Sequence, residues 1–145
     1  WTVDLMRLDN RIPNAATCRS LELGMIRCLD EISEQVRQIF GVSMTDAQIE
    51  SVLRGGAISA DDRVRAVIHA QAGQYVRDLL STIMESGLDV RAMPTIFLGG
   101  GAALLKRHVS ATDGLCRPLL LDNVSLNAKG YEQLTARMLG GEHSV

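Results

Sequence analysis

The stretch at 95–105 decides the expected fold, and it reads TIFLGGGAALL. The apolar run within Pro94–Leu98 has no polar interruption after Thr95, which is typical of a buried strand in the middle of a sheet. Gly99–Gly101 then ends the strand, and Ala102–Val109 has the pattern of a short helix. A ligand can lie directly on the backbone of such a turn because glycine has no Cβ, and the following helix presents unpaired amides. The stretch therefore predicts a ligand site at the carboxyl end of a strand.

The residues at the start of the chain predict a hairpin followed by a helix. Residues 1–8 alternate between apolar and polar side chains, with a break in the alternation at Met6. Asp9-Asn10-Arg11 has the chemistry of a tight turn, so a second strand is expected over 12–18. From Leu21 the apolar spacing changes to that of a helix. Gly41 is expected to end this helix.

A short helix and a long helix are expected before the glycine turn. Thr45 and Gln48 form a capping-box pattern, which predicts a short helix that ends at Gly55-Gly56. Its inward-facing residues are expected to be Ile49, Val52 and Leu53. Ser59 is expected to cap the long helix, whose apolar stripe covers 64–84.

The order of the elements predicts the fold class. Pro118–Leu121 is expected to form another strand and Leu126–Leu139 a final helix. The order is then strand, strand, three helices, strand, helix, strand, helix. Residues 1–145 are therefore expected to form a single α/β domain, with its strands in one mixed sheet that helices cover on both faces.

Composition excludes several functional classes. The chain has 145 residues, of which 46% are hydrophobic, 22% charged and 3% aromatic, so a core of aliphatic residues is expected. The net charge is −2 and the basic residues are spread along the chain, which argues against direct binding of a nucleic-acid backbone. No apolar run approaches the roughly 20 residues that cross a bilayer. Cys18, Cys28 and Cys116 are expected to be small buried residues in a reducing cytoplasm.

The glycine turn allows three interpretations. Gly99 and Gly101 supply the G-x-G of a dinucleotide-binding fold, and Asp122 stands where its ribose-binding acid belongs, but Leu104 occupies the third glycine position. The turn could also be a connection that binds no ligand. The third interpretation, a mononucleotide site, uses the whole chain.

Three stretches carry a resemblance that covers nearly all of the chain in the same order. Their positions are 1–6 (WTVDLM), 20–25 (SLELGM) and 96–105 (IFLGGGAALL), and 127–131 (NAKGY) resembles the segment that begins the last helix of the family. The chain resembles the carboxy-terminal half of the ATPase domain in the actin, Hsp70 and sugar-kinase superfamily. Within it, the chain is similar to the plasmid-segregation actins of the ParM/StbA group. Because the chain opens at Trp1 inside a strand, the amino-terminal half and its phosphate loops are expected in a longer protein.

The resemblance implies a ribonuclease-H-like fold and a site for ATP or ADP with Mg²⁺. In the family, the glycine turn packs against the adenosine and its neighbouring phosphate, and the glycine at the start of the first helix approaches the ribose and phosphates. The short helix at 45–54 corresponds to the adenine-side wall, and the metal-coordinating acids belong to the other half. The implied nucleotide contacts are Gly24, Gln48, Ile49, Leu53, Gly99, Gly100, Gly101 and Ala102. A side chain at Gly101 is therefore expected to displace the nucleotide without unfolding the domain.

The implied function is that of a cytoplasmic, filament-forming ATPase in plasmid DNA segregation, with DNA contacted through an adaptor protein. This half is expected to lack catalytic residues of its own. Half of a sugar or acetate kinase, half of a chaperone of the Hsp70 type, or a non-catalytic module remain alternatives. His69 is expected to be a structural residue, and His108 and His143 have no partners at metal-binding spacing. Asp61-Asp62 are expected to complement a helix dipole.

Overall fold

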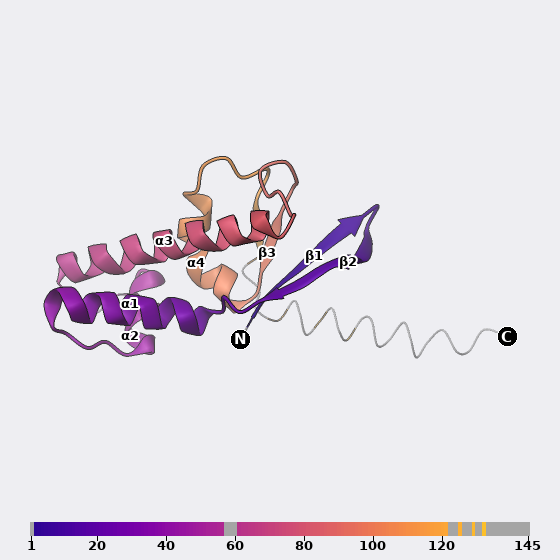
Figure 1. The fold of residues 1–145 in the computed structure, drawn as a ribbon. Coiled ribbons are helices and arrows are strands. Elements are labelled where there is room, and N and C mark those ends of the chain that lie inside the picture. Colours follow the sequence, from indigo (N-terminus) through magenta and orange to yellow (C-terminus); the bar gives the residue numbers. More distant parts are fainter. Residues whose placement is uncertain (1, 57–60, 122–124, 126–128, 130–131, 133–145) are drawn as a thin grey trace.

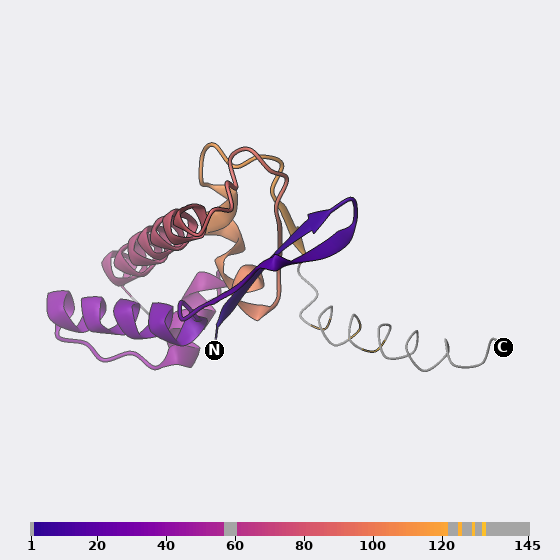
Figure 2. The ribbon, with the colours of Figure 1, turned by 45° about the vertical axis from the view of Figure 1, so that its right-hand side comes forward.

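The structure is a computed structural model that describes residues 2–56 and 61–121, together with residues 125, 129 and 132. It is of the mixed α/β class, as expected, and its buried side chains form one hydrophobic cluster. The helices make up one part, and a long hairpin projects away from them (Figures 1 and 2). The expected final helix at Leu126–Leu139 lies outside the continuously described residues.

The hairpin consists of β1 (Val3–Asp9) and β2 (Ile12–Leu21), which pair antiparallel. The turn residues Asn10 and Arg11 have φ values of 53° and 69°, so two residues with positive φ connect the strands. The second strand is longer than the expected 12–18. The register shifts between Leu5 and Arg7, where Met6 interrupts the alternation of the sequence.

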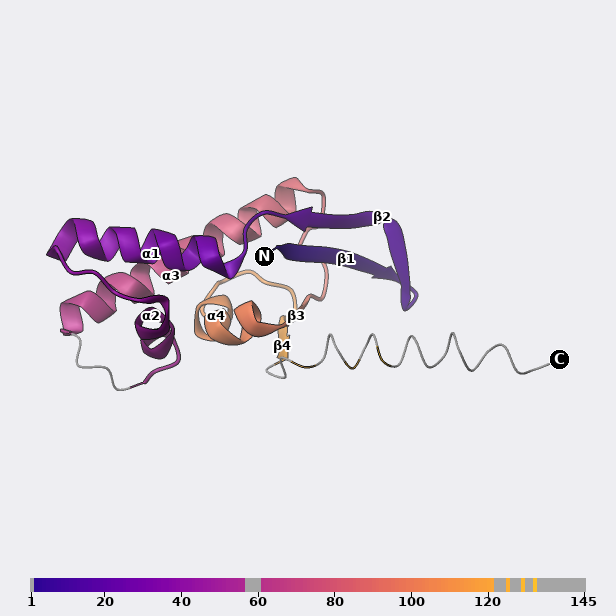
Figure 3. The same ribbon diagram turned by 90° about the horizontal axis from the view of Figure 1, so that it is seen from below.

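Three helices build most of the core. They are α1 (Met25–Phe40), α2 (Asp46–Leu53) and α3 (Asp62–Glu85). α1 and α3 lie side by side, and α2 packs against both (Figures 1 and 3). Their buried faces supply the largest fully enclosed side chains, which are Ile32, Ile49, Ile68, Val36, Val52, Val76 and Cys28. The expected aliphatic core is confirmed.

Local sequence signals explain most helix ends. Gly41 adopts φ of 68° and donates its N–H to the Arg37 carbonyl at 2.9 Å, so it ends α1 as expected. Both bonds of the Thr45–Gln48 capping box are present at the start of α2. The prediction that Ser59 caps α3 is wrong, because the Asp61 side chain accepts the Arg63 N–H at 2.9 Å as the N-cap. The sequence offers Ser59, Asp61 and Asp62 as possible caps near this helix start, and only one residue can occupy the N-cap position.

The glycine turn lies in a small parallel β–α–β unit. β3 (Ile96–Leu98) pairs in parallel with β4 (Leu119–Leu121), and α4 (Gly100–Ser110) connects them. This confirms the expected strand, turn and helix, with shorter strands.

The expected single mixed sheet is not observed. The described strands form two separate two-stranded sheets, β1–β2 and β3–β4. β3 pairs with β4 alone, so it is not a central strand. The expectation of a buried strand is also wrong, because Ile96 is 54% exposed and Leu98 is 44% exposed. The apolar run predicts a strand correctly, but the pairing of strands depends on long-range contacts that the run does not encode. The finer ribonuclease-H-like assignment therefore remains a proposal.

Two further expectations have mixed outcomes. Cys28 is fully buried, whereas Cys18 is exposed on the hairpin and Cys116 is half-buried. The prediction that all three cysteines are buried is therefore confirmed only for Cys28. All three thiols are free. Within the described ranges, no helix is both long enough and apolar enough to cross a membrane.

Candidate functional site

Two helices begin at the same place in the fold, and a glycine precedes each of them. Gly24 is the N-cap of α1 and Gly99 is the N-cap of α4. A Cβ at Gly101 would lie 2.9 Å from Cγ and 3.3 Å from Sδ of Met25, the first residue of α1. The two helix starts are therefore in contact. We call Gly24, Met25 and Gly99–Gly101 the glycine junction.

The two helix starts of the junction differ chemically from the other two helix starts. α2 and α3 have side-chain caps from Thr45 and Asp61 and an acidic residue in the first turn. α1 and α4 have neither a side-chain cap nor an acid in the first turn. Their first amides and positive dipole ends are therefore uncompensated by their own side chains, which is the arrangement that binds phosphate at helix N-termini.

The three glycines of the turn have different structural roles. Gly99 has φ of 97° and ψ of 178°, a conformation that is essentially confined to glycine. Gly100 is exposed, and a Cβ there would meet no atom within 4 Å. Gly101 provides the room in which Met25 packs. A side chain at Gly101 would have to displace the Met25 side chain, so we expect the substitution to lower stability as well as nucleotide affinity.

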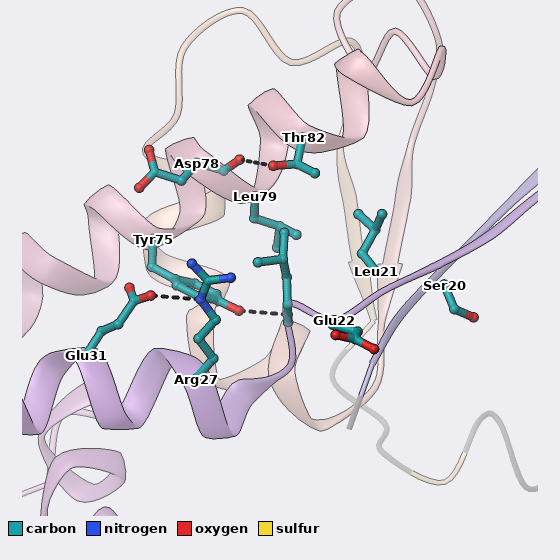
Figure 4. A pocket seen from close by; sticks show the side chains of 10 residues that line it. Ser20, Leu21, Glu22, Arg27, Glu31, Tyr75, Asp78, Leu79 and Thr82 are labelled. Carbon is teal, nitrogen blue, oxygen red and sulfur yellow. Dashed lines mark hydrogen bonds and ion pairs between the residues drawn. The ribbon is translucent and has the colours of Figure 1, made fainter.

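Tyr75 attaches the start of α1 to the middle of α3. Its hydroxyl donates to the carbonyl oxygen of Leu23 at 2.7 Å (Figure 4). The Gly24 carbonyl oxygen lies 3.0 Å from the same hydroxyl and shares this hydrogen bond. Burial raises the pKa of Tyr75 to about 12, so the phenol stays protonated and remains a donor. Sequence reasoning placed Tyr75 only in the apolar stripe of the long helix. Its hydroxyl role could have been suspected because a buried tyrosine needs a hydrogen-bond partner.

We expect Tyr75→Phe to lower the free energy of unfolding by about 1–2 kcal/mol, because a buried carbonyl then loses its donor. Urea denaturation followed by circular dichroism measures this loss. Thr82→Val is the matched control, since Thr82 donates to the Asp78 carbonyl at 3.0 Å on an exposed part of the same helix. The control should change stability by less than about 0.5 kcal/mol. Equal losses in the two variants would contradict the anchoring role of Tyr75.

A cavity of about 430 Å³ adjoins this anchor, between the β2–α1 connection and α3 (Figure 4). The Tyr75 ring and the side chain of Leu79 form part of its wall. Arg27 and Glu31, one turn apart on α1, close one side through an ion pair of 2.9 Å. The lining contains the three acids Glu22, Glu31 and Asp78 and only one cation, Arg27, so its net negative charge offers less to an anion than the helix starts do.

The structure also places the expected adenine-side residues. α2 packs against α4, but the side chains of Ile49 and Leu53 are 0% and 5% exposed and belong to the hydrophobic core. Gln48 is exposed, and its Oε1 accepts the Thr45 N–H at 2.8 Å. Ala102 lies in the first turn of α4, next to the junction. Gly24, Gly99, Gly100, Gly101 and Ala102 are thus brought together, whereas Ile49 and Leu53 fill the core.

Metal ligands are not grouped in the part of the chain that the structure describes. No three His, Cys, Asp or Glu side chains gather there in a metal-binding arrangement. Asp122 and His143 lie outside the described residues. His69 and His108, which sequence reasoning treated separately, meet with Nδ1 and Nε2 3.3 Å apart.

Comparison with protein-family models, with curated proteins and with solved structures found no match to this chain.

Proposed function

We propose that this chain is the nucleotide-binding half of an actin-like, filament-forming ATPase that acts in plasmid DNA segregation in the cytoplasm. The observation that carries the proposal is the glycine junction, where two uncapped helix starts without first-turn acids meet. Sequence resemblance indicated Gly24 and Gly99–Ala102 as nucleotide contacts, and these residues lie around this one place. A ribonuclease-H-like fold of the complete protein is part of the same proposal.

The junction suits the phosphate end of ATP or ADP. The first amides of α1 and α4 are donors for phosphate oxygens, and the two helix dipoles add positive potential at the same point. Gly100 leaves open space at the surface, so a ligand could approach the backbone there. The adenosine would lie along Gly99–Ala102. ATP supplies the phosphoanhydride bond, and this chain's contribution is to bind and orient the nucleotide.

Within the described ranges, no three His, Cys, Asp or Glu side chains gather in a metal-binding arrangement. As part of the same proposal, the acids that coordinate Mg²⁺ lie mainly in the other half of the complete protein. We therefore assign no hydrolytic residue to this chain.

Assembly and partners follow from the same proposal. Self-association into filaments is expected of the complete protein, and plasmid DNA would be contacted through an adaptor protein. The net charge of −2 and the dispersed basic residues support an indirect contact, because direct binding to a phosphate backbone needs a concentrated positive surface.

Two measurements test the proposal in the full-length protein. Isothermal titration with ATP and ADP should show saturable binding at one site per chain. Light scattering and electron microscopy should then show polymers that require ATP or GTP and disappear when the nucleotide is removed. Nucleotide binding without polymers at high protein concentration would favour a kinase of the same superfamily. Absence of nucleotide binding would contradict the proposal and favour a non-catalytic module.

A further inference from the structure

A groove lies at the opposite end of α4 from the glycine junction. It has a volume of about 690 Å³ and is bounded by α3, the segment after α3, the last turn of α4 and the loop that follows. The Cys116 N–H donates to the Val90 carbonyl at 3.0 Å and ties the two loops together. The volume is in the range of small-molecule sites.

Two arginines line this groove without a carboxylate partner. Neither Arg77 nor Arg91 forms an ion pair within the described ranges, whereas Arg7, Arg27, Arg37 and Arg54 do. Arg77 Nη2 donates to the neutral Gln74 Oε1 at 2.7 Å, which leaves its charge uncompensated. Asp113 is the acidic residue of the lining.

Gly73 makes room for two of these polar side chains to approach the same point. A Cβ on Gly73 would lie 3.5 Å from Arg77 Nη1 and 3.7 Å from His108 Nδ1. The guanidinium of α3 and the imidazole of α4 therefore both lie beside Gly73, which also lines the groove. On the far side, Arg91 Nε lies 3.9 Å from the position of a Cβ on Gly114.

The histidine pair makes His108 a potential donor at this point. Burial is the main cause that lowers the pKa of both His69 and His108. The charges of Arg107 and Arg65 lower the pKa of His69 further. His69 and Arg107 do the same for the pKa of His108. Both rings are then neutral near pH 7. If His69 Nδ1 carries the shared proton, His108 Nε2 accepts it and His108 Nδ1 carries a hydrogen beside Gly73. A negative ligand would select this tautomer.

We propose that this groove binds a small organic phosphate, with its phosphate beside Arg77 and His108 Nδ1 and with Arg91 adding positive charge from the far side of the groove. Guanidinium groups match phosphate oxygens in geometry and charge. The apolar part of the lining would cover the organic portion of the ligand, and it consists of Leu80, Met84, Val90 and Leu115.

Two features of the groove oppose a negative ligand. Together they contribute less negative charge than the positive charge of the two guanidinium groups. The carboxyl end of α4 contributes about half a negative charge. Its carbonyls at Arg107, His108 and Val109 already accept hydrogen bonds from Ala111 and Thr112. Asp113 contributes one negative charge, which does not cancel Arg77 and Arg91 together.

The test uses phenyl phosphate as the probe and NMR on the ¹⁵N-labelled protein at pH 7.5. Saturable binding is expected, with shifts at His69 and His108 and a ¹⁵N signature of the Nδ1–H tautomer at His108. Arg77→Gln should weaken binding at least fivefold. Arg37→Gln is the control, because Arg37 is exposed on α1 and pairs with Glu34 at 2.6 Å. Thermal denaturation of each variant verifies that it is folded.

Each outcome decides the proposal. Absence of saturable shifts at the histidine pair would overturn it, and so would an equal loss of affinity in Arg37→Gln. Inorganic phosphate that binds as tightly as phenyl phosphate would refute the role of the apolar lining. Gly100→Val should leave binding in this groove unchanged, so a failure here is distinguishable from a failure of the proposed nucleotide site.

Discussion

Replacing Ile68 by alanine should lower the free energy of unfolding by about 3 kcal/mol, within the range of roughly 2–5 kcal/mol for such core truncations. Ile68 is 0% exposed and lies on α3, which packs against α1, α2 and α4. The loss has two parts. One is the favourable free energy of burying the methyl and methylene groups that are removed, and the other is the cost of the cavity that closely packed neighbours cannot fill. Urea denaturation of the two proteins, fitted with a common slope, measures the difference.

Ile96→Ala is the matched control, because it removes the same atoms from a residue that is 54% exposed on β3. It should cost less than about 1 kcal/mol, since little apolar surface is buried and strand propensity spans only about that range. Similar losses at the two positions would contradict the core as described. They would indicate instead that β3 is covered in the folded protein.

The second large effect is expected in the glycine turn, where valine should lower stability strongly at one position and hardly at all at the neighbouring one. Gly101→Val should destabilise the fold by about 1–3 kcal/mol, because a Cβ there lies 2.9 Å from Met25 Cγ and the added methyl groups overpack the contact. Gly100→Val should change stability by less than about 0.5 kcal/mol, because its Cβ meets no atom within 4 Å.

Gly100→Val, which should barely change stability, is expected to have a large effect on nucleotide affinity. In a folded full-length protein, Gly100→Val should weaken binding of an ATP analogue at least tenfold, about 1.4 kcal/mol, because its side chain occupies the space proposed for the ligand. Isothermal titration measures the affinity, and urea denaturation measures the stability of the same samples. Unchanged affinity in a folded Gly100→Val protein would remove the glycine turn from the proposed site. Gly87→Ala offers no suitable control, since Gly87 has φ of 92° and any side chain there is strained.

The sequence alone determined the features that depend on residues within about one helical turn. The capping box of Thr45 and Gln48, the stop at Gly41 and the inward faces of α2 and α3 are confirmed, because caps and apolar periodicity act between near neighbours. The strand, glycine turn and helix at 96–110 are confirmed for the same reason. The choice of Asp61 over Ser59 as a cap shows the limit of such rules.

How these elements meet depends on contacts between segments that are far apart in the sequence. His69 and His108 are 39 residues apart in sequence, and Tyr75 reaches Leu23 across 52, so no local pattern could pair them. The contact of Gly101 with Met25 and the division into two small sheets likewise depend on packing between distant segments. Each partner taken alone is compatible with many neighbours, and the choice is made by the shape of the shared core, which every helix contributes to at once.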